Sequence, residues 1–169
     1  MATFEAQVEG LTGISIGIAS SPTQDELSTF LTDGATDIIN RYLRVDKASA
    51  SSFGTITSES GNGTIIDGEI IDVWASDGTN DHPAVRVSAA IGKKASDTSS
   101  LFYRSQYNPY YYKEGRRVLV KPNGGSVLHI SYPVVSYDNE NVYNFPNQYL
   151  PLMVLYASIR SLENAMAGK

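Results

Sequence analysis

The stretch RVLVKPNGGSVLHISY, residues 117–132, carries the strongest folding signal in the sequence. Apolar residues alternate with polar ones on both sides of PNGG, as is typical of half-buried β-strands. The pair Asn123-Gly124 adopts positive φ at little cost, and its twist matches that of paired strands. The stretch therefore predicts an antiparallel hairpin, with strands over residues 117–121 and 126–132.

Upstream of this hairpin the sequence continues to favour strands. Strand patterns cover the FGTITSES and AVRVSAAI segments and the region near Tyr110, and they are separated by turn signals at residues 61–63 and 77–81. The segment TIIDGEIIDVWA forms one strand or two, because Asp67-Gly68 is a possible turn. The β-rich middle, residues 53–137, is expected to form an antiparallel sheet or a small sandwich.

Long helices are predicted on either side of this middle in the sequence. Thr23 and Glu26 have the spacing of a capping box, and an apolar stripe follows over residues 23–44. The C-terminal helix, residues 148–167, is apolar nearly all round in its first half, which indicates burial on several sides. Its stripe consists of Leu152, Leu155, Tyr156, Ile159, Leu162 and Met166, widened by Met153, Val154 and Ala157.

A shorter helix is predicted over residues 3–13, with Thr3 as its cap and Gly13 as its end. The fold class is α+β, with the two long helices packed together or on one face of the sheet. We expect a single domain over residues 1–169, made of a helical part (1–46), the β-rich middle (53–137) and the C-terminal helix (148–167).

Composition limits the class of protein. Charged residues make up 18% of the chain, below the roughly 25% usual for soluble domains, which suits a surface covered by neighbouring molecules. There are no cysteines, which excludes disulfides and thiolate metal sites. The longest apolar run, residues 150–159, is too short for a membrane span, and MATFEAQVEG lacks the basic start of a cleaved leader. We expect no membrane association.

The net charge of −5 conceals an asymmetry along the chain. Residues 1–85 contain 3 basic and 13 acidic side chains, whereas residues 86–169 contain 10 basic and 5 acidic ones. Such a division favours either nucleic-acid contact by the basic half or a head-to-tail contact between copies, which closes into rings. The acidic total argues against DNA as the main partner, because phosphate binding depends on cations.

No catalytic, cofactor or metal site is expected from the motifs. His82 and His129 have no partner residue at a catalytic spacing, and the segment beginning at Asp77 fails the calcium-loop pattern at its sixth and twelfth positions. Asp67, Glu69 and Asp72 suggest a glycosidase pair, but nothing places a second carboxylate opposite them. The sequence therefore favours a protein that is not an enzyme.

The segment SLFYRSQYNPYYYKEGRRVLVKPNGG, residues 100–125, is both aromatic and basic. Tyrosine and arginine are enriched at protein interfaces, but they also stack on bases and bind phosphates, and Tyr110 to Tyr112 could simply pack across a sheet. We favour the protein interface. Its expected residues, with one from the C-terminal helix, are Arg86, Lys93, Lys94, Arg104, Tyr107, Tyr110, Tyr112, Arg116, Arg117 and Met153.

Several segments together resemble small virion structural proteins of tailed bacteriophages, in particular the head–tail adaptor or neck subunits that join portal to tail. The resemblance covers residues 23–44 and 99–166. It is carried by DGATDII within the first long helix and by SSLFYRSQYNPYYYKEGRRVLVKPN, HISYPVVSYD and YNFPNQYLPLMVLYASIRSLENAM.

The resemblance implies a virion protein, assembled in the host cytoplasm, that forms a homo-oligomeric ring, often of twelve copies, between portal and tail proteins. Genomic DNA would pass through the lumen without sequence-specific binding. Known adaptors are often mostly helical, and this chain departs from that pattern in its strand-rich middle. The alternative function is a carbohydrate- or nucleic-acid-binding β-module that uses residues 103–121, with Tyr107, Tyr110, Tyr112 and Arg116 as its platform.

Overall fold

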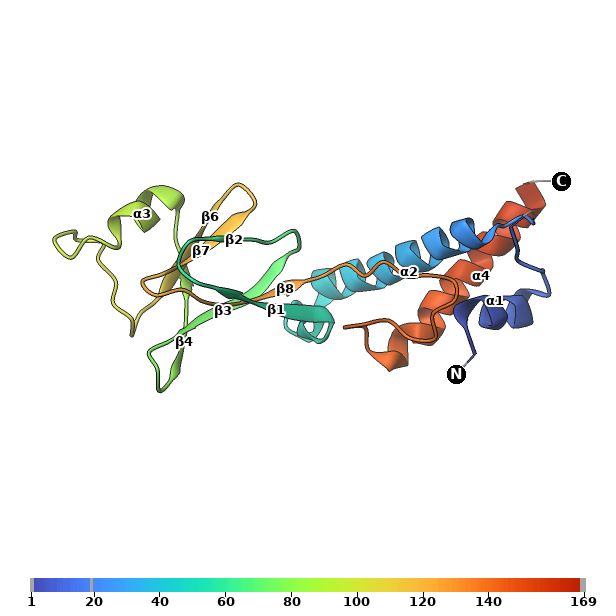
Figure 1. Cartoon of the computed structure of the whole chain (residues 1–169), viewed down its shortest axis with the longest axis horizontal. Coiled ribbons are helices and arrows are strands. Elements are labelled where there is room, and N and C mark those ends of the chain that lie inside the picture. The colour runs from blue at the N-terminus through green and yellow to red at the C-terminus, as the bar shows by residue number, and fades with distance from the viewer. Residues whose placement is uncertain (1, 19, 168–169) are drawn as a thin grey trace. The chain divides into compact units, whose positions relative to one another are not determined.

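Helices occupy both ends of the chain and strands occupy its middle in the computed structural model, which describes residues 2–18 and 20–167 (Figure 1). This mixture of helices with two β-sheets confirms the α+β class. The elements are α1 (Phe4–Thr12), α2 (Gln24–Val45), η1 (Ser49–Phe53), β1 (Gly54–Glu59), β2 (Thr64–Ile65), β3 (Ile70–Ser76), β4 (Asp81–Pro83), β5 (Val85–Arg86), α3 (Ala89–Lys94), β6 (Tyr110–Glu114), β7 (Arg117–Lys121), β8 (Gly125–Ile130), η2 (Asn147–Tyr149) and α4 (Leu150–Ala167).

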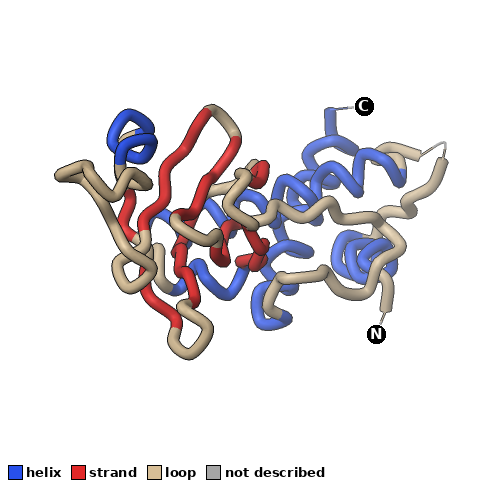
Figure 2. The backbone as a smooth tube through the Cα atoms, turned by 60° about the vertical axis from the view of Figure 1, so that its left-hand side comes forward, coloured by secondary structure: helices blue, strands red, loops and turns tan. Residues whose placement is uncertain are grey.

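The chain divides into two compact units. Unit 1 combines the two ends of the chain, residues 1–53 and 132–169, and unit 2 is the continuous middle, residues 54–131. Among the described residues, every strand falls in unit 2, together with the short helix α3 (Figure 2). Each unit buries its own apolar residues, and the single domain expected over residues 1–169 stays a prediction.

The predicted caps of the first two helices are confirmed. The Thr3 hydroxyl accepts a hydrogen bond from the Ala6 amide, and α1 ends at Gly13, whose φ of 69° is left-handed. At the start of α2, the Thr23 hydroxyl accepts from the Glu26 amide while the Glu26 carboxylate accepts from the Thr23 amide. This reciprocal capping box satisfies two of the amides that a helix start leaves unpaired.

Helix α4 packs on both α1 and α2 within unit 1 (Figure 1). The contact with α2 is close at Gly34, where an added Cβ would lie 3.0 Å from Cδ1 of Tyr156. Along α2 the buried positions follow one stripe, Leu27, Leu31, Ala35 and Ile39, as the sequence predicted. Of the two arrangements expected for the long helices, α2 and α4 show the one in which they pack together.

An extended segment, residues 132–139, runs along α2 (Figure 1). Hydroxyls of Ser28 and Thr32 accept hydrogen bonds from the amides of Tyr137 and Val135, at 3.1 and 3.0 Å. The far end of the segment reaches α1, where the Phe4 amide donates to the Asn139 carbonyl at 2.9 Å. Polar side chains on α2 thus satisfy a backbone that has no strand partner.

Unit 2 contains two four-stranded sheets, in the orders β1-β8-β3-β4 and β2-β7-β6-β5. Strands β7 and β8 form where the sequence predicts them, but the predicted pairing between them is wrong. β7 pairs with β6 and β2, whereas β8 pairs with β1 and β3. The hairpin is instead β6–β7, with Gly115 in its turn at a φ of 60°. Among the described strand pairs of the two sheets, β5 and β6 run parallel, which departs from the expected antiparallel pattern.

The core of unit 2 draws on both sheets. Val118 and Val120 alternate with outward residues along β7, and they pack with Val127 of β8 and with Val73 of β3. Two sheets that bury one shared set of residues favour the sandwich over the single sheet among the two expected forms. The full set is Ile66, Ile70, Val73, Ala75, Val118, Val120 and Val127.

Helix α3 lies where the sequence predicted a strand. The segment AVRVSAAI forms only the two-residue strand β5 before Ser88 caps α3, its hydroxyl accepting from the Ile91 amide. The alternation of valines ends at this cap, because a serine hydroxyl competes for backbone amides at a helix start. The buried Ala95 then packs with Tyr110 and Tyr112 on the second sheet.

Candidate interaction surfaces

Helix α4 has two apolar faces, and unit 1 covers only one of them. Met153, Val154 and Ala157 are buried, as are the small residues Ser158 and Ser161. Five large apolar side chains remain 40–68% exposed at spacings of 3, 4, 3 and 4 residues. We call these five the α4 stripe: Leu152, Leu155, Ile159, Leu162 and Met166.

The covered face of α4 is the one with small residues. Ala157, Ser158 and Ser161 are buried there, whereas the close contact with Gly34 of α2 is made by the half-buried Tyr156. Of the six residues of the stripe expected from the sequence, Tyr156 is half-buried and the other five, the α4 stripe, are exposed, so the expected burial on several sides is wrong for this face. Met153, an expected interface residue, is fully buried inside unit 1, so it cannot contact a partner. The row of small residues was the signal that could have distinguished the two faces.

Tyr110 and Tyr112 are core residues, which corrects the expectation that they lie at an interface. Their rings stack with centroids 6.4 Å apart, and the Tyr110 hydroxyl donates to the Gly92 carbonyl at 3.1 Å. A Cβ at Gly92 would overlap the Tyr112 ring, so α3 sits directly on these tyrosines. Burial of the Tyr112 side chain raises the pKa of its hydroxyl. For these two tyrosines, packing across the sheet is the function that the geometry supports.

The other expected interface residues lie at the surface of unit 2. Arg104 is half-buried, and its guanidinium donates to the Asn108 side chain at 3.2 Å. Within the basic-aromatic segment, Leu101, Phe102 and Tyr103 are also exposed, and sequence reasoning did not single them out. The exposed expected residues are Arg86, Lys93, Lys94, Tyr107, Arg116 and Arg117.

Some of these cations are already paired within unit 2. Arg116 forms an ion pair with Asp67, and Lys93 lies 3.0 Å from the Glu114 carboxylate. The hydrogen bond to Glu114 raises the pKa of Lys93. In the part of the chain that the structure describes, Arg86, Lys94 and Arg117 make no ion pair.

The charge asymmetry of the sequence is redistributed by folding. The basic residues 86–121 share unit 2 with the acidic residues 59–81, so unit 2 has 8 basic and 8 acidic side chains. Unit 1 has 5 basic and 10 acidic side chains, a net charge of −5. The acidic character of the protein is thus concentrated in the helical unit.

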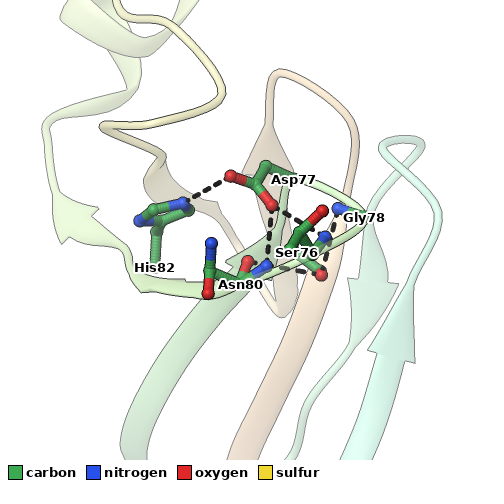
Figure 3. Close-up of polar contacts among 6 residues, drawn as sticks. Ser76, Asp77, Gly78, Asn80 and His82 are labelled. Atoms are coloured by element: carbon green, nitrogen blue, oxygen red, sulfur yellow. Dashed lines mark hydrogen bonds and ion pairs between the residues drawn. The ribbon is translucent and has the colours of Figure 1, made fainter.

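Asp77 organises the turn between β3 and β4 (Figure 3). Its carboxylate accepts hydrogen bonds from the amides of Thr79 and Asn80, both at 2.8 Å, and contacts Nε2 of His82 at 2.9 Å. These hydrogen bonds lower the pKa of Asp77 to about 2, and the bond from the Asn80 amide has the largest effect. The arrangement is that of an Asx turn, in which the aspartate replaces backbone hydrogen bonds.

Replacing Asp77 with asparagine should remove a pH dependence of stability. The low pKa of Asp77 means that its bonds stabilise the fold above about pH 4 and lose that effect as the pH falls towards about 2. We expect D77N to melt below wild type at pH 7, with the two melting temperatures converging as the pH approaches 2. Thermal melting followed by circular dichroism across this range measures the effect.

The control for that experiment is Asp81→Asn, whose side chain makes no hydrogen bond in the described ranges 2–18 and 20–167. Its melting temperature should follow the wild-type pH curve. A constant difference between D77N and wild type from pH 7 down to pH 2 would contradict the assigned role of the Asp77 carboxylate.

The other residues that the sequence suggested for a catalytic or metal site make hydrogen bonds or ion pairs within the fold. His129 contacts the Thr57 hydroxyl at 3.0 Å across the β1–β8 pair. Asp67 pairs with Arg116, and the Asp72 carboxylate accepts from its neighbouring Val73 amide. Across the described residues, no three histidine or acidic side chains come together in a way that could hold a metal ion.

The sequence matches no known protein-family model and no curated protein. None of the helices in the described ranges is long and apolar enough to cross a membrane.

Proposed function

We propose that this protein is a non-enzymatic structural subunit of a tailed-phage virion, which forms an oligomeric ring at the head–tail junction and links portal to tail. The observation that carries the proposal is the exposed α4 stripe, a row of large apolar side chains on the side of α4 away from its buried residues. Surfaces of this kind mark sites of protein association. The station in the virion rests on the sequence resemblance to adaptor and neck subunits.

The energetics favour an apolar partner for the stripe. Burying a large apolar side chain completely contributes about 1.5–3 kcal/mol, so the roughly half-exposed stripe offers about 4–8 kcal/mol per copy. Association costs about 4–15 kcal/mol in lost freedom of motion. One stripe against a polar surface barely offsets that cost, whereas two apolar surfaces together can exceed it.

For the ring itself, we propose a contact between the cations of unit 2 and the acidic unit 1 of the next copy. Arg86, Lys94 and Arg117 supply exposed positive charge, and unit 1 carries a net charge of −5. A contact between two different surfaces is heterologous, and it closes into a ring when the rotation allows. In this proposal the long helices precede and follow the β-sandwich along the chain. Genomic DNA passes through the lumen of the ring without specific contacts.

The ligand-binding alternative has less support. Its proposed platform combined Tyr107, Tyr110, Tyr112 and Arg116, but Tyr110 and Tyr112 lie beneath α3. A base or sugar stacks only on a ring face that solvent can reach.

The function is tested by size-exclusion chromatography with light scattering, with and without the portal protein of the same phage. We expect an oligomer of the 18.3 kDa chain that co-elutes with the portal. Reversing the charges of Arg86, Lys94 and Arg117 should weaken the ring, whereas the same reversal at the ion-paired Arg160 of α4 should not. A wild-type chain that neither self-associates nor binds portal contradicts the proposal.

A further inference from the structure

The α4 stripe has the spacing of a coiled-coil seam. Its members follow one another at 3, 4, 3 and 4 residues, which places them at alternating a and d positions over two heptads. At 3.6 residues per turn they fall on the side of α4 opposite to Met153, Val154 and Ala157. An a/d seam requires a second helix with the same spacing, because each side chain fits between residues of the facing helix.

Nothing charged interrupts this seam. The charged residues of α4 (Leu150–Ala167) are Arg160 and Glu163, which form an ion pair with each other at 2.9 Å. A facing helix with the same sequence therefore meets no unpaired like charge at the seam.

We propose that the α4 stripe pairs with the α4 stripe of a second copy of this chain. The second copy provides the required spacing by identity, and a self-complementary patch gives a two-fold contact. This inference rests on the proposed function, because the α4 stripe carries that function and the inference names the partner of the stripe. The α4 pair is separate from the ring contact, which joins different surfaces of unit 2 and unit 1.

The absence of cysteine from the sequence allows a direct test by single-cysteine cross-linking. The variants are Ile159→Cys, at the centre of the stripe, and Arg160→Cys, its neighbour outside the stripe. Ile159 and Arg160 are both exposed, so exposure alone does not favour one thiol over the other. In a two-fold pair the thiol of the I159C variant lies within the apolar seam between the helices, and in a parallel pair it faces its own symmetry mate, whereas the thiol of R160C lies outside the seam.

Under mild oxidation we expect I159C to form a disulfide-linked dimer at least about tenfold faster than R160C, as read on non-reducing gels. Equal rates for the two variants, or no dimer from either, would overturn the pairing. Circular dichroism confirms that both variants are folded before the comparison.

A double variant, Leu155→Asp with Leu162→Asp, separates this inference from the proposed function. Both side chains are exposed within the single chain, so the fold should be retained while the α4 pair dissociates. We expect at least a hundredfold weaker dimerisation in sedimentation experiments, with portal binding retained. If this variant dimerises as strongly as the wild-type chain, the pairing is contradicted. If the wild-type chain does not bind the portal protein, the proposed function is contradicted instead.

Discussion

Replacing Gly68 with alanine is expected to prevent unit 2 from folding. Gly68 precedes β3, and a Cβ at this position would overlap the backbone carbonyl of Ile130 at the end of β8. The adjacent Glu69 carbonyl accepts the Ile130 amide at 2.8 Å, so the two segments cannot separate without losing that bond. A clash with backbone has no flexible side chain to relieve it, and we expect a loss of more than about 4 kcal/mol.

Urea unfolding and soluble yield measure this effect. The matched control is Gly10→Ala, where an added Cβ meets nothing within 4 Å on the exposed side of α1. There alanine should stabilise the chain by about 1 kcal/mol, because glycine is a poor helix former. A G68A variant that unfolds at the wild-type urea concentration contradicts the packing of β3 against β8.

Replacing Glu59 with glutamine is expected to have the second largest effect on stability. Glu59 is only 4% exposed at the end of β1, and its carboxylate accepts the Gly63 amide at 2.6 Å and the Val120 amide at 2.8 Å. β1 belongs to the first sheet and β7, which contains Val120, to the second. One carboxylate thus connects the two sheets through their backbones.

Glutamine has nearly the same shape but only one acceptor oxygen, so its amino group must face a backbone donor. We expect a loss of about 2–4 kcal/mol, because a buried amide then lacks its partner and a charge-assisted bond is lost. The same substitution at the exposed Glu114, which pairs only with Lys93, should cost less than about 1 kcal/mol. Chemical unfolding of E59Q and E114Q compares the two, and equal losses would show that Glu59 does not join the sheets.

Local signals in the sequence were sufficient for the helix starts. Thr3 and the pair Thr23–Glu26 cap their helices through residues within one turn, so the pattern and the structure depend on the same contacts. Strand positions were predicted for the same reason, since alternation at Val118 and Val120 reflects one buried face.

Strand pairing was not predictable from the PNGG turn. Gly124 has the positive φ that a hairpin turn would need, 82°, but a Cβ there would overlap the Glu59 carbonyl. The turn is therefore packed against the end of β1, and the chain crosses from one sheet to the other instead of folding back. Pairing depends on partners distant in sequence, which periodicity does not identify.

The candidate surface was predictable only in part. Periodicity identified the large apolar residues of α4, but it could not determine which face the chain covers, because this depends on how α1 and α2 pack on the helix. Likewise the tyrosine-rich composition did not separate the buried Tyr110 and Tyr112 from the exposed Tyr107. The capping signal at Ser88 would have revealed α3, and with it the cover over these two tyrosines.

Sedimentation velocity over a wide range of protein concentration tests the central claim, that the exposed apolar face of α4 exists for assembly. The account predicts that the wild-type chain sediments as an oligomer and that the variant with aspartate at positions 155 and 162 shifts towards smaller species. A wild-type chain that remains a single 18.3 kDa species at the highest concentration it reaches contradicts the account.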